Sequence, residues 1–305
     1  QNDWSRVLPR VHILTAEAYR LQGAWSEALE QLEEVRLLAG EGDLQMLADV
    51  DRSAAWCEYR LGRLGAAKTG FENAQQRFVD AGRNMEAADC DQGIALVLRL
   101  DGRFEEALEH IKSARNHCES EGNRHGLAWC ENNLGEQERA LGNLRRAAKH
   151  YRRAWELFKA IGATRASGFP RLNLCMLQLQ SGQFIEASKG AEKLKVLFSS
   201  TGDDGMLMVT HCVLLPCLVE LGDWEGWDSC WNRILSLYES TGLVEADVAQ
   251  VMRLAGKMAQ KRGRLKEAQQ ALQWSLSQWQ KLNQLEESAA TEKLLSSLAE
   301  EQVGC

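Results

Sequence analysis

Two series of glycines divide the sequence into segments of nearly constant length. The first series stands at positions 42, 82, 122, 162, 202 and 242, an unbroken spacing of 40 residues. The second stands at positions 23, 62, 102, 142, 182, 222 and 263, at spacings of 39 to 41 residues. A fixed period of this length is typical of repeat proteins, in which each segment is one structural unit that stacks on its neighbours. Each unit of this chain contains two breaks.

Apolar residues between the glycines recur at steps of three and four, for example over residues 104–114 and 144–155. This step is the period of an α-helix that buries one face. A glycine just after a helix suits the left-handed C-cap conformation, and Asp43, Asn123 and Asp203, which follow first-series glycines, are predicted N-caps. We therefore expect an all-α protein in which each repeat is an antiparallel pair, helix A followed by helix B.

Small and large residues recur in phase with the second glycine series. The residue two positions after the glycine is always large and apolar, and alanine stands five positions after it in six of the seven repeats: Ala28, Ala67, Ala107, Ala147, Ala187 and Ala268. The pattern, as in LGNLRRA at residues 141–147, resembles the tetratricopeptide repeat (TPR). The resemblance implies a right-handed α-solenoid whose concave wall is lined by A helices. The 40-residue units that close with glycine resemble the arrays of MalT-like bacterial signalling ATPases and Pins-type adaptors.

We predict about seven repeats, at about 1–42, 43–82, 83–122, 123–162, 163–202, 203–242 and 243–283, followed by a capping helix and tail at 284–305. The last segment is rich in glutamate, which suits a helix that closes the array with a polar face. The longest apolar stretch, residues 206–221, is too short and too interrupted to span a bilayer comfortably, so we expect a buried helix and no membrane partner. The chain opens without an initiator methionine or a leader, and we expect it to be part of a larger protein.

The TPR resemblance implies that A-helix residues 13, 10, 9, 6 and 3 positions before the second-series glycine face the concave groove. In repeats 4 to 6 this rule selects Trp129, Asn132, Asn133, Glu136, Arg139, Phe169, Leu172, Asn173, Met176, Leu179, Val209, Cys212, Val213, Pro216 and Val219. The set is nearly all apolar in repeats 5 and 6, so we expect an exposed peptide- or partner-binding wall, deepened by helix kinks at Pro170 and Pro216. The alternative is a small error of helical phase that has placed core residues on the wall.

Polar side chains on the same wall indicate how a peptide backbone would be held. Asn133 and Asn173 occupy the same position in successive repeats and resemble the asparagine ladder of several TPR arrays, since an amide offers both a donor and an acceptor. Arginine stands three residues before the glycine in repeats 1, 3 and 4: Arg20, Arg99 and Arg139. These guanidinium groups either hold a carboxylate of the ligand or pair with local acids such as Glu17 and Glu136.

A basic stretch contrasts with the net charge of −7. Residues 139–171 hold nine basic residues and one acid, and the basic patch on helix B of repeat 4 consists of Arg145, Arg146, Lys149, Arg152 and Arg153. The patch is either a solvated helix face or a dock for an acidic partner segment or another domain of the same protein. Because the rest of the chain is acidic and the patch lacks exposed aromatic residues, we do not expect a nucleic-acid partner.

Candidate catalytic groups and metal ligands are sparse. The six histidines form no H-E-x-x-H motif, no four ligands have the spacing of a zinc site, and the nine cysteines form no C-x-x-C pair. We therefore expect no enzyme activity, no metal and no cofactor. An odd number of cysteines inside apolar helical runs is typical of a reducing, cytoplasmic compartment. Trp224, Trp227 and Trp231 follow helical spacing and are either core residues or the wall of a pocket.

These features favour a non-enzymatic protein- or peptide-binding scaffold, the sensor or regulatory module of a larger cytoplasmic signalling protein that binds through its concave groove. Two alternatives remain open. The first is a small-molecule-sensing solenoid domain of a MalT-like regulator, which would contain an aromatic-lined cavity near Trp227. The second is an interdomain spacer, whose groove would be filled by its own side chains.

Overall fold

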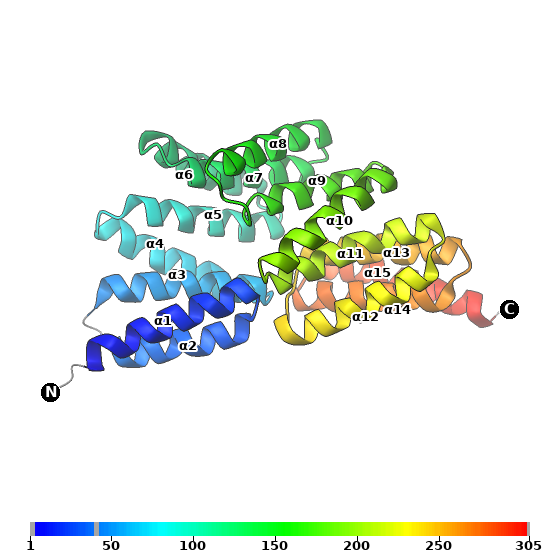
Figure 1. Ribbon diagram of the computed structural model, residues 1–305, viewed down its shortest axis with the longest axis horizontal. Helices are drawn as coiled ribbons and strands as arrows, with labels where there is room; N and C mark the ends of the chain where they lie inside the picture. The colour runs from blue at the N-terminus through cyan, green and yellow to red at the C-terminus, as the bar shows by residue number, and fades with distance from the viewer. Residues whose placement is uncertain (1–3, 40–42, 304–305) are drawn as a thin grey trace. The chain divides into compact units, whose positions relative to one another are not determined.

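The computed structural model describes residues 4–39 and 43–303, with side chains over residues 7–39 and 43–300. Gly42 of the first glycine series and the end of the predicted tail lie outside the described residues. Within the described part every regular element is an α-helix and none is a strand (Figure 1). The A helices are α1 (Trp4–Gln22), α3 (Leu44–Arg60), α5 (Asn84–Leu100), α7 (Arg124–Ala140), α9 (Gly168–Gln180), α11 (Asp204–Leu221) and α13 (Ala246–Lys261). The B helices are α2 (Trp25–Ala39), α4 (Leu64–Asp80), α6 (Phe104–Ser120), α8 (Leu144–Ala160), α10 (Phe184–Ser200), α12 (Trp224–Thr241) and α14 (Leu265–Lys281), and α15 (Leu285–Val303) follows them.

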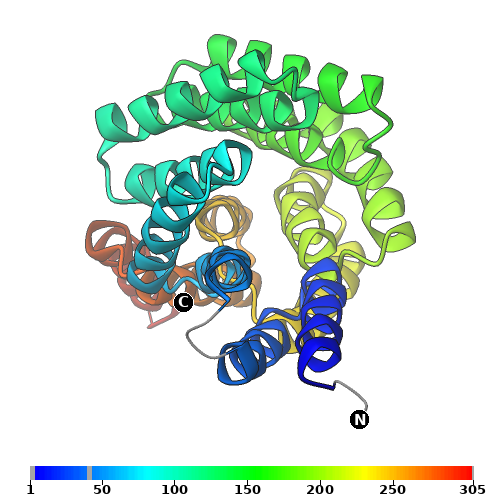
Figure 2. The same cartoon turned by 90° about the vertical axis from the view of Figure 1, so that its left-hand side faces the viewer.

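Internal contacts define two compact units, residues 1–174 and residues 175–305, with the boundary inside α9. In unit 1 each A helix from α1 to α7 packs on its own B helix, and α2, α4 and α6 also pack on the A helix that comes next in the chain (Figure 2). In unit 2, α11 packs against α10, α12 and α13, and α14 packs against α13 and α15. The prediction of an all-α solenoid of consecutive helix pairs is confirmed.

Both glycine series end helices in the left-handed conformation. The second series has φ between 71° and 81°, and the described members of the first series have φ between 58° and 69°. A Cβ atom would be strained there, which is why glycine recurs at these positions. After α5, the amide of Gly102 donates to the carbonyl of Arg99 at 3.1 Å and the amide of Arg103 donates to that of Leu98 at 2.9 Å, so the last carbonyls of the helix are satisfied. Asn283, with φ of 55°, takes the glycine's place before α15.

The three predicted N-caps are confirmed. The side-chain oxygens of Asp43, Asn123 and Asp203 accept the backbone amide three residues on, at 3.0, 3.0 and 3.1 Å. Each bond satisfies one of the amides that a helix leaves unpaired at its N-terminus. The start of α3, α7 and α11 is therefore fixed by a side chain.

Helices A and B of each pair cross closely because small residues stand at the crossing. The alanine five residues after the second-series glycine is fully buried in every repeat that has one. Where the A helix has glycine, a large side chain of the B helix fills the space: a Cβ on Gly135 would come within 2.5 Å of the Tyr151 ring, and one on Gly256 within 2.7 Å of Leu272. In these two repeats the crossing therefore admits one large side chain but not two.

In repeat 6 large residues stand at the positions where the other helix pairs have small ones. Trp227 replaces the alanine, and Leu215 stands seven residues before the glycine, where the other repeats have a small residue. Both side chains are fully buried. The Trp227 and Trp231 rings stack with centroids 6.2 Å apart, and Trp231 meets Trp274 edge-on at 5.8 Å. The interpretation of this stripe as core packing is confirmed for Trp227 and Trp231.

Helix α11 is the only described helix whose length and composition would suit a membrane span, and 72% of that span is buried inside the protein. It packs against three helices of unit 2, as the prediction of a buried helix requires. Pro216 lies inside α11 and is buried. Pro170, in contrast, is the third residue of α9, where no helical hydrogen bond is lost. The predicted kink at Pro170 is therefore wrong, because the proline stands in the first turn of a helix that begins late.

Substituting leucine for Ala67 should destabilise the protein, since the fully buried alanine lies at the crossing of α3 and α4. We expect the free energy of unfolding to fall by about 1–3 kcal/mol through overpacking. The neighbouring Ala66 is exposed, so Ala66→Leu is the matched control and should change stability little. Urea denaturation followed by circular dichroism measures both, and equal stabilities of the two variants would contradict the close crossing.

Candidate functional site

A polar cluster joins three successive A helices of unit 1. The Nδ2 of Asn173 in α9 donates to Oδ1 of Asn132 at 3.0 Å and to Oε1 of Glu136 at 3.3 Å. Asn132 donates to the same Glu136 oxygen at 3.0 Å, and Arg99 of α5 donates to the other oxygen at 2.8 Å. Asn132 is 2% exposed, and the side chains of Arg99 and Glu136 are 14% and 15% exposed. The Glu136 carboxylate, shielded from water, thus accepts hydrogen bonds from one guanidinium group and two side-chain amides.

The remaining polar residues of the predicted wall have separate partners. Asn133 donates to Gln92 of α5 at 3.3 Å, and Arg139 donates to the hydroxyl of Tyr151 at 3.3 Å. The expected succession of Asn133 and Asn173 is therefore not one ladder, because Asn173 bonds the neighbouring Asn132 instead. Of the predicted arginine pairs, Arg20 with Glu17 is present at 2.8 Å, whereas Glu136 pairs with Arg99 of the preceding repeat.

Two predicted aromatic residues meet at one end of this cluster. Trp129 of α7 is half-buried, and its ring meets that of Phe169 edge-on at 5.0 Å. Phe158 of α8 packs against Trp129 in the same way at 5.1 Å. We define the A-helix wall of unit 1 as the residues on α3, α5, α7 and the first part of α9 that lie 13, 10, 9, 6 and 3 positions before the second-series glycine. In repeats 4 and 5 this wall is polar along α7 and aromatic at its N-terminal end.

Apart from the half-buried Phe169, the apolar residues predicted for an exposed wall in repeats 5 and 6 are buried. Exposure is 5% or less for all of them: Leu172, Met176, Leu179, Val209, Cys212, Val213 and Val219. The expectation of exposed apolar area is therefore wrong, and the alternative of a phase error fits the burial better. For α11 the reason is that neighbours on three sides leave no apolar face open to solvent.

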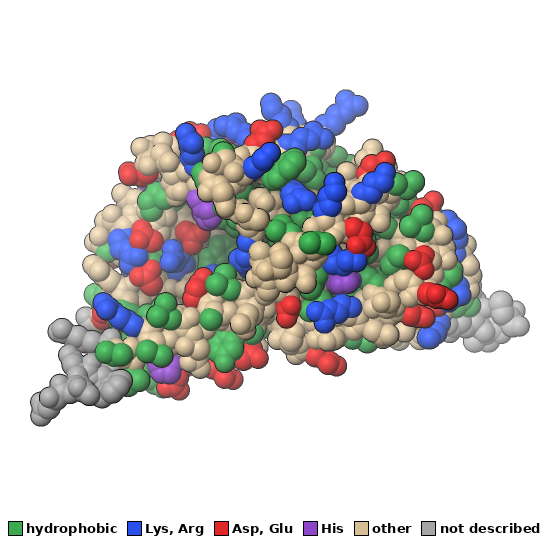
Figure 3. All heavy atoms as spheres, viewed as in Figure 1, with side chains coloured by type: hydrophobic (Ala, Val, Ile, Leu, Met, Phe, Trp, Pro, Cys, Tyr) green, Lys and Arg blue, Asp and Glu red, His purple; other side chains and the backbone are tan. Residues whose placement is uncertain are grey.

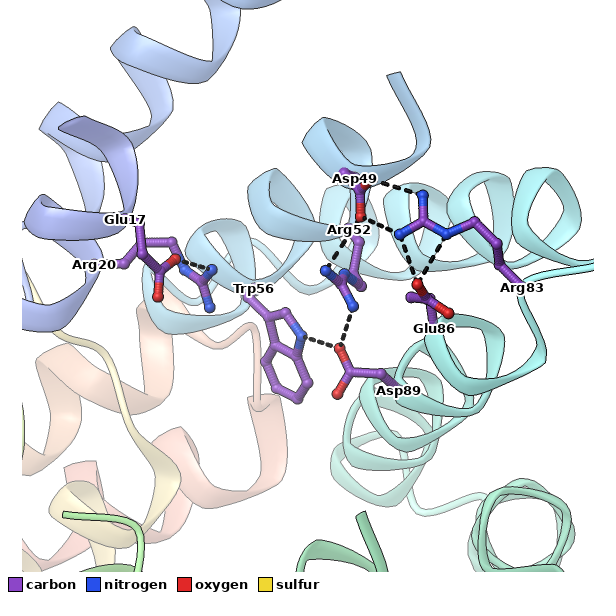
Figure 4. A network of polar contacts seen from close by, with 8 residues as sticks. All are labelled: Glu17, Arg20, Asp49, Arg52, Trp56, Arg83, Glu86 and Asp89. Carbon is purple, nitrogen blue, oxygen red and sulfur yellow. Dashed lines mark hydrogen bonds and ion pairs between the residues drawn. The ribbon is translucent and has the colours of Figure 1, made fainter. Parts of the chain in front are cut away.

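The polar wall continues into repeats 2 and 3, as Figure 4 shows. Asp49 of α3 accepts from Arg83 at 2.8 Å and from Arg52 at 3.3 Å. Arg52 also pairs with Asp89 of α5 at 3.5 Å, and the indole of Trp56 donates to Asp89 at 3.4 Å. These residues were not predicted, because the spacing rule was applied in full only to repeats 4 to 6. The same rule, 13, 10 and 6 residues before the glycine, selects Asp49, Arg52, Trp56 and Asp89.

A second missed set is a series of buried acids with the repeat period. Eleven residues before the second-series glycine stand three acids: Asp51, Asp91 and Glu131. Asp51 accepts from Arg36 of the preceding B helix at 2.9 Å. Asp91 accepts from Gln75 of α4 and from His110 of α6, and Glu131 accepts from His150 of α8 at 2.8 Å. The 40-residue spacing of these acids was the signal that could have identified them.

The Asp91 cluster contains an acid, a histidine and a hydroxyl but lacks the order of a catalytic triad. His110 Nδ1 lies 2.7 Å from one oxygen of Asp91, and Ser113 donates to the other at 3.1 Å. In a triad the histidine stands between the acid and the nucleophile. Here both groups bond the acid directly, so the arrangement holds helices rather than activating the hydroxyl.

Burial makes several cysteine thiols unreactive, whereas a hydrogen bond with Cys130 lowers the pKa of Cys118. Burial raises the pKa of Cys57, Cys217 and Cys230 to about 12, which keeps these thiols protonated at neutral pH. In the described part of the chain no three His, Cys, Asp or Glu side chains are grouped closely enough to hold a metal ion.

The basic patch is exposed on α8. Arg145, Lys149 and Arg152 face solvent and have no ion-pair partner among the described residues. Arg146 and Arg153 reach back to α7, to Glu138 at 3.8 Å and to Glu131 at 3.3 Å. Figure 3 shows basic side chains gathered at the edge where Figure 1 places α8.

Comparison with known proteins supports the resemblance to the tetratricopeptide repeat. Residues 84–160, which span α5 to α8, match the family model of that repeat. No curated protein matches the sequence.

Three solved structures illustrate the fold. The Rap conjugation gene regulator of plasmid pLS20, in complex with the Phr* peptide, is 15% identical, with 91% of this chain and 75% of that chain covered and a TM-score of 0.73. The aspartyl phosphate phosphatase F of Bacillus subtilis is 10% identical, with 94% and 93% covered and a TM-score of 0.56. A signal transduction ATPase with a TPR sensor from Pyrococcus horikoshii is 12% identical, with 99% and 46% covered and a TM-score of 0.59. At these identities the likeness shows the TPR-like solenoid fold.

Replacing Glu131 should change the acid stability of the protein. Burial raises the pKa of Glu131, but the hydrogen bond from His150 and the charge of Arg153 outweigh it and leave the pKa below its ordinary value. As the pH falls, Glu131 is therefore protonated in the unfolded chain before it is protonated in the folded protein. Its contribution to the free energy of unfolding is complete above the ordinary glutamate pKa, and it is lost as the pH falls through the lowered pKa of the folded state. We expect Glu131→Gln to cost about 1–3 kcal/mol at pH 7 and to flatten the loss of stability between about pH 5 and pH 3.

Urea denaturation at a series of pH values measures this effect. Glu156 is an exposed acid of α8, so Glu156→Gln is the control and should follow the wild-type pH profile. A Glu131→Gln profile as steep as that of the wild type would show that this carboxylate is not stabilised in the folded state.

Proposed function

We propose that the chain is a non-enzymatic scaffold that binds a peptide or protein segment on the A-helix wall of unit 1. The observation that carries the proposal is the polar network that joins α5, α7 and α9 through Arg99, Glu136 and the two asparagines at 132 and 173. Buried polar groups cost desolvation energy, so a wall built for stability alone would be apolar. Amides and a guanidinium group instead match the carbonyls, amides and carboxylates of a peptide. The Rap regulator of similar fold was solved with a peptide, which supports the same class of ligand.

Under this proposal some of the predicted site residues contact the ligand and others support the fold. Glu136, Arg139 and Asn173 supply polar contacts, and Trp129 and Phe169 supply apolar contact at the end of the wall. Asn132 and Asn133, at 2% and 4% exposure, lie behind these residues and position them. The buried residues of α11 support the fold of unit 2 and do not touch the ligand.

The proposal extends to the context of the chain. The 40-residue period supports a MalT-like or Pins-like array of seven repeats with a capping helix. The match to the ATPase with a TPR sensor covers 46% of that protein, and this supports a sensor or regulatory role in a larger signalling protein. Eight free buried cysteines support a reducing, cytoplasmic location. Other domains of the same protein are candidate partners; we propose no nucleic-acid, membrane or cofactor role. One similar structure is a phosphatase, but the Asp91 cluster and the protonated thiols support a non-catalytic chain.

Peptides selected from a random display library on the purified protein test this function. We expect Asn173→Ala to weaken their binding about tenfold, because two hydrogen bonds of the network and one partner for the peptide are lost. Asn116 is exposed on α6, and Asn116→Ala should bind as the wild type does. Fluorescence anisotropy gives the affinities, and circular dichroism shows whether each variant is folded. Failure to select any peptide, or equal binding by a folded Asn173→Ala protein, would refute the wall as the site.

A further inference from the structure

The outer face of α8 carries positive charge that the protein does not neutralise. Arg145, Lys149 and Arg152 stand on this face at helical spacing, exposed and without an ion-pair partner in the described chain. A solvated helix face normally mixes both signs, because opposite charges at three- and four-residue steps stabilise the helix. On α8 the only acid is Glu156.

The preceding B helix shows that this charge is not a general property of the repeat. The positions equivalent to Arg145, Arg146 and Lys149 are occupied on α6 by three acids: Glu105, Glu106 and Glu109. Two of these acids are paired on their own helix, Glu106 with Arg103 and Glu109 with Lys112 at 2.9 Å. The charge therefore reverses between one repeat and the next: among the described residues Glu105 is the one acid of this set without an ion-pair partner on α6, whereas α8 keeps three such cations.

A cavity lies beside the basic face, between α7 and α8. Its volume is about 350 Å³, and its lining consists of Glu131, Glu138, Arg146, Lys149, His150 and Arg153. Both acids of the lining already have cationic partners at 3.8 Å or less. Lys149 is exposed at the cavity and has no such partner among the described residues, so it is available to a negatively charged group that enters.

We propose that the outer face of α8 docks an acidic segment of a protein partner. Carboxylates of the segment pair with Arg145, Lys149 and Arg152, and one side chain enters the cavity beside Lys149. This interaction surface is separate from the A-helix wall and goes beyond the proposed function. Exposed pairs of this kind form fast and are weakened by salt, so the surface acts as an electrostatic dock.

The dimensions of the face favour a short acidic peptide over a nucleic acid. Helix α8 has 17 residues, a length of roughly 25 Å, which an extended segment of about eight residues spans. The acids at the equivalent positions of α6 would repel a longer polyanion. The exposed aromatic residue on α8, Trp155, has the guanidinium group of Arg171 over its ring at 5.9 Å, so that face is not free to stack on a base.

Fluorescence anisotropy with a labelled eight-residue peptide of alternating aspartate and glutamate tests the proposal. The Asn/Gln peptide of the same length is the neutral probe. We expect the wild-type protein to bind the acidic peptide only, with an affinity that falls as salt rises, and the K149E/R152E variant to bind it about tenfold or more weakly.

A matched variant separates a local site from net charge. Lys189 and Lys193 are exposed at the corresponding part of α10, and K189E/K193E lowers the net charge by the same amount. It should bind the acidic peptide within about twofold of the wild type. Equal weakening by both variants, or no binding by the wild type, would overturn the dock; tighter binding of a single-stranded oligonucleotide of equal charge would replace it with a nucleic-acid site. Asn173→Ala should leave acidic-peptide binding unchanged, so failure of the wall and failure of the dock are distinguishable.

Discussion

The left-handed glycine of the second series, at the end of each A helix, sets the register on which the rest of the structure depends. It turns the chain back within about three residues, so each B helix runs antiparallel to its A helix from a defined starting point. Because the helix after each turn starts in the same register, a position counted from the glycine meets the same neighbours in every repeat. The alanine at five residues after the turn is fully buried in all six repeats that have it, and Trp227 is equally buried in the seventh.

The same register explains which helices the buried acids connect. Eleven residues before the turn, a side chain lies among its own A helix, its own B helix and the preceding B helix. Asp51 and Asp91 accept bonds from the preceding B helix, and Glu131 accepts them from its own. In unit 2 the equivalent His211 is held neutral, since burial lowers its pKa to about 4, and its ring nitrogen lies 3.4 Å from the sulfur of Cys230. A buried ion pair adds little net stability when its desolvation cost is counted, so the acids specify helix register more than they stabilise the fold.

The period, the helix pairs, the caps and the close crossings could all be predicted from the sequence, because each depends on a local preference of glycine, alanine or aspartate. The wall was predicted in part. Asn132, Glu136 and Asn173 come together, since their positions depend on the register alone. The exposure of Leu172 and Val213 was predicted wrongly, because burial depends on what packs around a helix, and α11 is enclosed by three others. Pro170 was misread for a similar reason: a proline kinks a helix only if the helix begins well before it, and α9 begins at Gly168.

The two proposed surfaces differ in what a ligand must displace. On the A-helix wall the amides and the Glu136 carboxylate already bond each other, so a peptide exchanges existing hydrogen bonds for new ones and gains little from each. Such a surface favours a ligand whose polar groups replace every hydrogen bond that is broken, because a buried polar group left without a partner costs binding free energy. On α8 the three unpaired cations, Arg145, Lys149 and Arg152, have only water to give up. An acidic segment is therefore attracted from a distance but is held weakly by each pair. The wall therefore suits discrimination among ligands, whereas the face of α8 suits fast capture of a partner.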